Sequence, residues 1–145
     1  MLVAAEILLV EDNPADIRLT QEVLADSKLK NELHVVKDGA TALDFLYQRH
    51  GHEDAPRPDL VLLDLNLPGV DGHQVLKTVK TDPALRAIPV VIMTTSSADE
   101  DILSTYENAA NCYVTKPIDF DQFIKVVETL EEFWFTIVRL PKSDT

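Results

Sequence analysis

The clearest indication of the fold class of this chain is the segment Asp59-Leu60-Val61-Leu62-Leu63-Asp64-Leu65-Asn66-Leu67-Pro68-Gly69-Val70-Asp71-Gly72. Its apolar run has the length of a β-strand and shows no polar alternation, which is typical of a central strand covered by helices on both faces. Asp64 lies where this run stops. Because ligands of open parallel sheets bind at the carboxyl ends of the strands, Asp64 is a candidate site residue. The dipeptides Pro68-Gly69 and Asp71-Gly72 predict a turn after the strand.

The composition of the chain indicates one globular domain, since its 145 residues are 46% hydrophobic and 26% charged. No apolar run is long enough to cross a membrane, and the first residues do not resemble a signal peptide, so we expect a cytoplasmic protein without membrane contact. Cys112 is the only cysteine, which excludes an internal disulfide. The formal net charge of −12 repels nucleic acid, so direct DNA binding is not expected.

The rest of the chain alternates between strand patterns and helix patterns. Short apolar runs predict further strands at residues 6–10, 33–36, 89–93 and 112–114. Apolar side chains at helical spacing follow the strands, and Asn13-Pro14 is typical of the start of a helix. Five strands that alternate with five helices predict an α/β fold with a doubly wound, five-stranded parallel sheet.

Polar side chains stand where four of the predicted strands end. They are Glu11 and Asp12, Asp64, Thr94, and Lys116. If the strands are parallel, these polar residues all lie at one edge of the sheet. Three carboxylates so near to one another require a proton or a cation between them. Mg²⁺ is the natural cation, because it takes oxygen ligands. A metal ion, a carboxylate nucleophile, a hydroxyl group and a lysine are the components that phosphoryl transfer needs.

Four short motifs make the chain similar to the receiver domains of two-component response regulators. They are Val10-Glu11-Asp12-Asn13-Pro14, Leu62-Leu63-Asp64-Leu65-Asn66-Leu67-Pro68, Met93-Thr94-Thr95 and Thr115-Lys116-Pro117. The spacings after Asp64 match those of the chemotaxis response regulator, and the similarity extends over residues 6–130. The resemblance implies a flavodoxin-like receiver domain at residues 1–132 that takes a phosphoryl group from a sensor histidine kinase, as one step of a phosphorelay.

The resemblance also implies which residues bind the metal and the phosphoryl group. Asp64 would be the phosphoacceptor. Asp12, Asp64 and the backbone carbonyl of Asn66 would bind Mg²⁺, with Glu11 acting through a water molecule. Mn²⁺ or Ca²⁺ can replace Mg²⁺ in such a site.

The same resemblance assigns the residues that respond to phosphorylation. Lys116, Thr94, Thr95 and Tyr113 would contact the phosphoryl group or change conformation with it, and the peptide bond before Pro117 would be cis. The altered surface would then change the contacts that the protein makes with partners. We therefore expect a signalling protein and not an enzyme, apart from its own phosphorylation and dephosphorylation.

Residues 133–145 form a C-terminal extension beyond the length of a plain receiver domain. The large apolar residues of this segment are Phe133, Trp134, Phe135, Ile137 and Val138. A closed core cannot hide three adjacent aromatic side chains, and an exposed apolar patch is typical of an interface. We interpret the segment as the interface of a homodimer or as a contact with another partner, with folding back over its own domain as the alternative. This extension, together with Val10-Glu11-Asp12-Asn13-Pro14-Ala15-Asp16, makes the chain similar to single-domain response regulators that pair with phytochrome-type histidine kinases and form dimers through the last helix.

Two other functions are compatible with parts of the sequence. A receiver fold that dimerises and binds partners whatever its phosphorylation state would carry the same motifs. A metal-dependent phosphatase of small molecules would share the aspartate nucleophile, but it needs a second acid two residues later, where Asn66 stands. His50 and His52 lie in a polar loop without a third ligand, so we interpret them as solvated loop residues.

Overall fold

A computed structural model describes residues 4–27, 30–67, 69–94, 112–115, 125 and 128–129. They form the elements β1 (Ala5–Val10), α1 (Pro14–Ala25), β2 (Asn31–Val36), α2 (Gly39–Leu46), β3 (Leu60–Asp64), α3 (Gly72–Thr81), β4 (Val90–Thr94) and β5 (Cys112–Thr115). The expected fourth and fifth helices lie outside the described residues, apart from Lys125, Glu128 and Thr129, which are helical.

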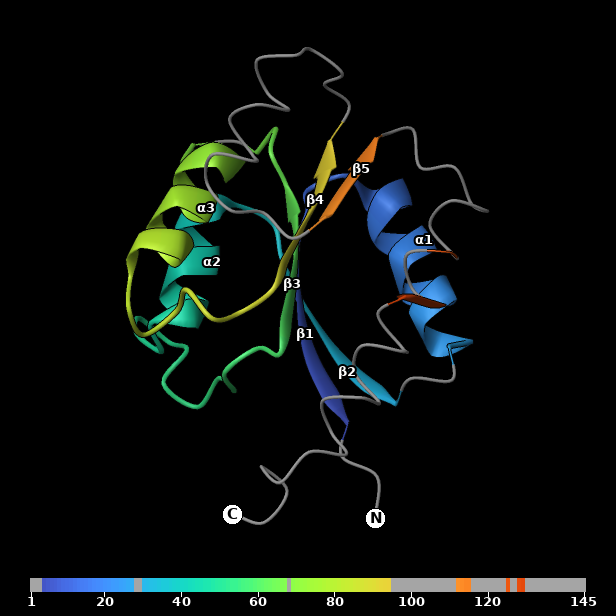
Figure 1. Ribbon diagram of the computed structural model, residues 1–145, viewed down its shortest axis with the longest axis horizontal. Helices are drawn as coiled ribbons and strands as arrows, with labels where there is room; N and C mark the ends of the chain where they lie inside the picture. The colour runs from blue at the N-terminus through green and yellow to red at the C-terminus, as the bar shows by residue number, and fades with distance from the viewer. Residues whose placement is uncertain are drawn as a thin grey trace.

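The strands form one parallel sheet in the order β2-β1-β3-β4-β5. Helix α1 covers one face of this sheet, and α2 and α3 cover the other (Figure 1). The predicted doubly wound α/β architecture is therefore confirmed. Among the described helices, none is long and apolar enough to cross a membrane.

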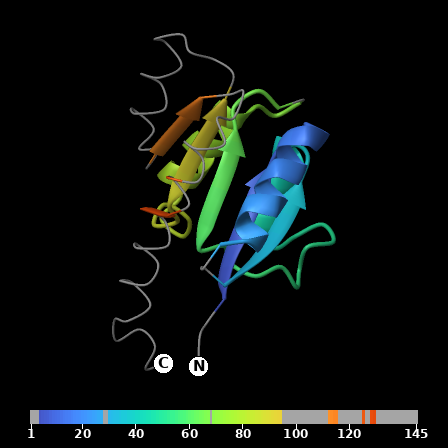
Figure 2. The ribbon, with the colours of Figure 1, turned by 90° about the vertical axis from the view of Figure 1, so that its right-hand side faces the viewer.

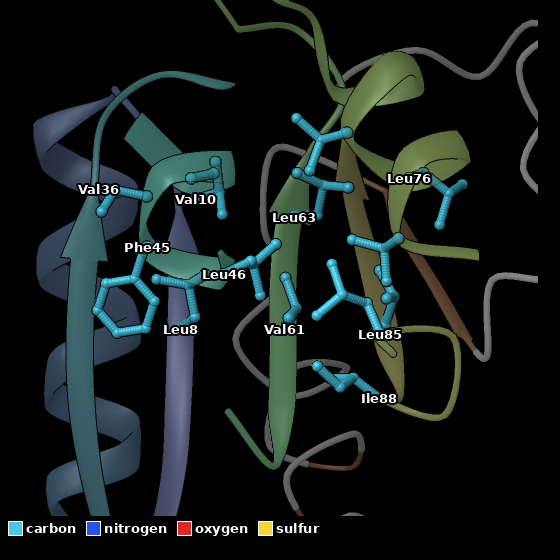
Figure 3. Packing of buried hydrophobic residues seen from close by; sticks show 14 of the residues in the cluster. Leu8, Val10, Val36, Phe45, Leu46, Val61, Leu63, Leu76, Leu85 and Ile88 are labelled. Carbon is cyan, nitrogen blue, oxygen red and sulfur yellow. The ribbon is translucent and has the colours of Figure 1, made fainter. Parts of the chain in front are cut away.

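Each face of the sheet carries its own layer of apolar side chains, because successive residues of a strand point to opposite faces. Leu63 and Leu76 belong to the layer under α2 and α3, as do Phe45 and Leu46 of α2 (Figure 3). Leu62 belongs to the layer under α1. Both layers continue through β1, β3 and β4, so these strands carry apolar residues on both faces apart from Glu6, Asp64 and Thr94, as the sequence of β3 predicts.

The direction of the strands places their carboxyl ends at one edge of the sheet (Figure 2). The chain first moves from β1 outward to β2 and then returns to β3 on the other side of β1. The strand order therefore reverses between β1 and β3. Ligands of open α/β sheets bind in the crevice at such a switch point.

The described helices begin with side-chain caps close to this edge. Asn13 accepts hydrogen bonds from the N–H groups of Ala15 (2.9 Å) and Asp16 (3.2 Å). Asp38 and Asp71 cap α2 and α3 in the same way. A cap of this kind stabilises a helix by about 1 kcal/mol. The helix start predicted from Asn13-Pro14 is thus confirmed.

The far ends of α2 and α3 are tied together by polar side chains. The hydroxyl of Tyr47 donates to the carboxylate of Asp82 at 2.5 Å. This bond raises the pKa of Tyr47 and lowers the pKa of Asp82, since it holds the proton on the phenol and stabilises the carboxylate. Arg57 donates to the carbonyl of Ala84 and anchors the polar loop of residues 49–58.

Replacing Leu63 with alanine tests whether β3 is the centre of the core. Leu63 is 1% exposed, so Leu63→Ala should lower the free energy of unfolding by about 3 kcal/mol in urea titrations. Leu33 is only partly buried on the edge strand β2, so Leu33→Ala should cost clearly less. Equal losses for the two variants would contradict a core centred on β3.

Candidate metal centre

Three carboxylates meet at the switch point of the sheet. Glu11 and Asp12 follow β1, and Asp64 is the last residue of β3. One carboxylate oxygen from each lies within 4.8 Å of those from the other two. Glu11 is completely buried and Asp64 is 4% exposed, whereas Asp12 is exposed. The group therefore has two buried members and one that solvent reaches.

Backbone amides orient the two buried carboxylates. The N–H of Asn13 donates to Oε2 of Glu11 at 3.1 Å, and the N–H of Asn66 donates to Oδ1 of Asp64 at 3.0 Å. In both cases the donor lies two residues after the acid, which is the local pattern of turns that a carboxylate stabilises. The turns after β1 and β3 thus set the direction in which each carboxylate points.

Pairing with β2 also fixes the position of the Glu11 backbone. Its N–H donates to the carbonyl of Val36 at 3.0 Å, which continues the ladder between β1 and β2 by one residue. Asp64 pairs in register with Met93 of β4. Both acids are therefore held by backbone pairing on one side and by a turn on the other.

The electrostatics of this cluster favour a cation. Two unit negative charges at about 5 Å repel each other by roughly 3 kcal/mol at an effective dielectric constant of 20. A divalent ion would offset this repulsion. The ligand atoms are all oxygens, which suits hard ions such as Mg²⁺ and not zinc, whose structural sites use sulfur and nitrogen. The donor set therefore fits the predicted metal.

Two of the predicted switch residues are described by their backbone alone. Thr94 is the last residue of β4 and pairs with Thr115 of β5. Tyr113 lies on β5 and pairs with Ile92. Thr94 therefore ends its strand at the same edge of the sheet as the carboxylates, while the side chains of Thr94 and Tyr113 lie outside what the structure describes.

The remaining predicted residues lie outside the described part of the chain. They are Thr95, Lys116 and Pro117, and the tail residues Phe133, Trp134, Phe135, Ile137 and Val138. Their roles stay predictions.

The loop histidines are not part of a metal centre in the described residues. His50 is exposed and bonds to the carboxylate of Asp44 at 3.1 Å. The ring of His52 contacts Phe45, with 5.9 Å between the ring centroids. The acidic trio is the one group of potential metal ligands within the described ranges.

Sequence reasoning missed the second role of Asn13. Its position before Pro14 predicts a helix cap, and the structure adds a hydrogen bond that its backbone N–H donates to the Glu11 carboxylate. The available signal was an acid at a strand end followed two residues later by a capping residue. This pattern predicts a turn in which a backbone N–H donates a hydrogen bond to the carboxylate.

The chain belongs to the family of response regulator receiver domains, whose family model matches residues 7–128. Members of this family are signalling proteins that pair with histidine kinases. Response regulator Rcp1 of Synechocystis sp. is 48% identical over 137 residues, which are 94% of this chain and 93% of Rcp1.

Two solved structures are similar to this chain over nearly its whole length. The crystal structure of the Mn²⁺-bound form of Rcp1 has a TM-score of 0.83 and 47% identity, and the match covers 94% of this chain and 99% of that one. The crystal structure of the phosphorylated cyanobacterial phytochrome response regulator RcpA has a TM-score of 0.84 and 47% identity, covering 96% and 99%. The receiver fold and the family expected from the motifs are therefore confirmed.

The crowding of carboxylates predicts that Mg²⁺ stabilises the folded protein. A ligand at one hundred times its Kd adds about 2.7 kcal/mol to stability, so the melting temperature should keep rising with the logarithm of the Mg²⁺ concentration above the Kd. Sodium chloride at matched ionic strength serves as the control. In Asp12→Asn one carboxylate of the trio is lost, and the rise should shrink strongly. A rise of equal size in this variant would contradict binding at the trio.

Proposed function

We propose that this response regulator accepts a phosphoryl group on Asp64 from a sensor histidine kinase in a Mg²⁺-dependent reaction. The observation that carries the proposal is the buried carboxylate of Asp64, with Glu11 and Asp12 within 4.8 Å at the switch point of the sheet. The phosphorylated protein then signals through changed contacts with its partners.

In this proposal Asp64 is the nucleophile and the other residues prepare it. A carboxylate oxygen of Asp64 attacks the phosphorus of the donor, and the donor nitrogen leaves as the acyl phosphate forms. The backbone N–H of Asn66 donates to Oδ1 of Asp64, so the carboxylate is oriented before the phosphoryl donor arrives. Asp12, Asp64 and the Asn66 carbonyl would hold Mg²⁺, with Glu11 acting through water. The ion would supply charge neutralisation for the transferred oxygens.

The proposal extends to the residues that respond to phosphorylation. Thr94, Thr95 and Lys116 would contact the phosphoryl oxygens, and Tyr113 would change its position with Thr94. The position of Thr94 at the end of β4, next to β3, supports this assignment. Differential contacts of this kind shift a conformational equilibrium, which is how a local charge change alters a distant surface.

We propose further that the kinase is of the phytochrome type and that the protein is cytoplasmic. The similarity to RcpA, a phytochrome response regulator, supports the kinase type. Residues 1–132 would form the receiver domain, and residues 133–145 would form the interface of a homodimer. The protein would catalyse only its own phosphorylation and dephosphorylation.

The rival proposal is a receiver fold that acts without phosphorylation. The acidic trio, with two of its three carboxylates buried, disfavours it, because clustered carboxylates cost stability and a protein that only presents a binding surface does not need them. A small-molecule phosphatase is disfavoured by Asn66, since an amide cannot donate the proton that a second acid would supply.

Asp64→Asn should abolish phosphate uptake while the fold is retained. Acetyl phosphate with Mg²⁺ should add one phosphate to the wild-type protein in intact-mass spectra, and a chelator should prevent it. Asp54 lies exposed in the loop of residues 49–58, so Asp54→Asn is the matched control and should label normally. Labelling of Asp64→Asn would refute this acceptor.

Trp134→Ala combined with Phe135→Ala should turn a dimer into a monomer. Removing two large aromatic side chains takes away most of the apolar area that a small interface offers. Light scattering gives the mass, with and without acetyl phosphate and Mg²⁺. An unchanged dimeric mass would place the interface elsewhere, and a monomeric wild-type protein would refute the homodimer.

A further inference from the structure

Gly39 makes a close backbone contact with the loop that follows β3. It is the buried first residue of α2. A Cβ atom at this position would overlap the carbonyl oxygen of Val70 and come within 3.0 Å of the Cβ of Val70. The glycine hydrogen therefore points at the Val70 backbone, and no other residue type leaves this space.

Gly72 makes a second close contact on the other side of the same loop. It is the first residue of α3, and a Cβ atom there would overlap the carbonyl oxygen of Asp64 and the Cα of Leu65. Its N–H donates to the carbonyl of Leu65 at 3.1 Å. The start of α3 thus rests directly on the end of β3.

The two contacts form a continuous stack from α2 to the phosphoacceptor. Gly39 touches Val70, and two residues later Gly72 touches the backbone of Asp64 and Leu65. Asn66 follows Leu65 directly in the chain, and its backbone N–H orients the Asp64 carboxylate. The atoms in contact are backbone atoms and the Cβ of Val70, and none of them can rotate away as the end of a side chain can.

We propose that Gly39 is a positioning residue for the metal centre, acting through Val70 on the loop that carries Asn66. This inference rests on the proposed binding of Mg²⁺ by Asp12, Asp64 and the carbonyl of Asn66. Gly39 touches neither the metal nor the phosphoryl group. Gly39 sets the distance between α2 and the loop that follows β3.

The packing decides which side moves when the contact is crowded. Helix α2 is anchored by Ala42, Phe45 and Leu46, which are buried in the core, and by its cap at Asp38. Val70 is only partly buried. A methyl group at position 39 therefore displaces the loop and not the helix. The loop cannot move without the backbone at Asn66, because Gly72 already lies in contact with the end of β3.

The test is the Mg²⁺ affinity of Gly39→Ala, measured by calorimetry on the full chain without a phosphate donor. Changes in residues that orient metal ligands commonly cost tenfold or more in affinity, so we expect a loss of about tenfold. A thermal melt measures stability separately. A purely structural role would lower the melting temperature and leave the affinity of the folded protein unchanged, and that result would overturn the proposal.

Ala40→Ser is the matched control, because it adds one atom at the neighbouring exposed position of α2. It should keep the wild-type affinity, and a tenfold loss there would overturn the specific role of Gly39. If Gly39→Ala does not fold, Val70→Gly decides. This variant removes the side chain that packs the loop against the core and frees the backbone beside Gly39, so the loop is no longer held at its distance from α2 and Mg²⁺ binding should weaken. Unchanged affinity would refute a role for the seating of this loop in positioning Asn66.

Mg²⁺ binding by the wild-type protein distinguishes a failure of the proposed metal centre from a failure of the role of Gly39. Absence of Mg²⁺ binding by the wild type would refute the proposed metal centre, and the role of Gly39 with it. Binding by the wild type together with equal binding by Gly39→Ala would refute only the role of Gly39.

Discussion

The pairing of β1 with β3 holds three mutually repelling carboxylates together at the ends of two neighbouring strands. Glu11 and Asp64 are buried, where water cannot screen their charges well. They stay together because β1 and β3 are paired and apolar on both faces, so neither strand end can move apart from the other. The stability of the core thus holds together carboxylates whose charges repel one another. A bound cation relieves this repulsion.

The fold and the acidic trio could be predicted from the sequence because their signals are local. The run before Asp64 lacks polar alternation, and Glu11 and Asp12 follow a similar run. Once the strands are parallel, the position of these acids follows from where each strand ends. The family resemblance supplied the roles of individual residues, which the spacing alone leaves open.

The contacts that position the site could not be predicted in the same way. The hydrogen bond from Asn13 to Glu11 depends on the shape of a turn, which the capping signal only suggests. The approach of Gly39 to Val70 joins residues far apart in the sequence, and it depends on the distance between α2 and the loop after β3. A glycine at the start of a helix is also compatible with simple conformational freedom.

Anomalous diffraction from crystals soaked in Mn²⁺ locates the bound ion without reference to any assay. We expect one strong peak at the carboxyl ends of β1 and β3, bonded to Asp12, Asp64 and the backbone carbonyl of Asn66, with Glu11 joined to it through water. A peak bonded to other residues, or no peak at the trio at saturating Mn²⁺, would refute the proposed metal centre.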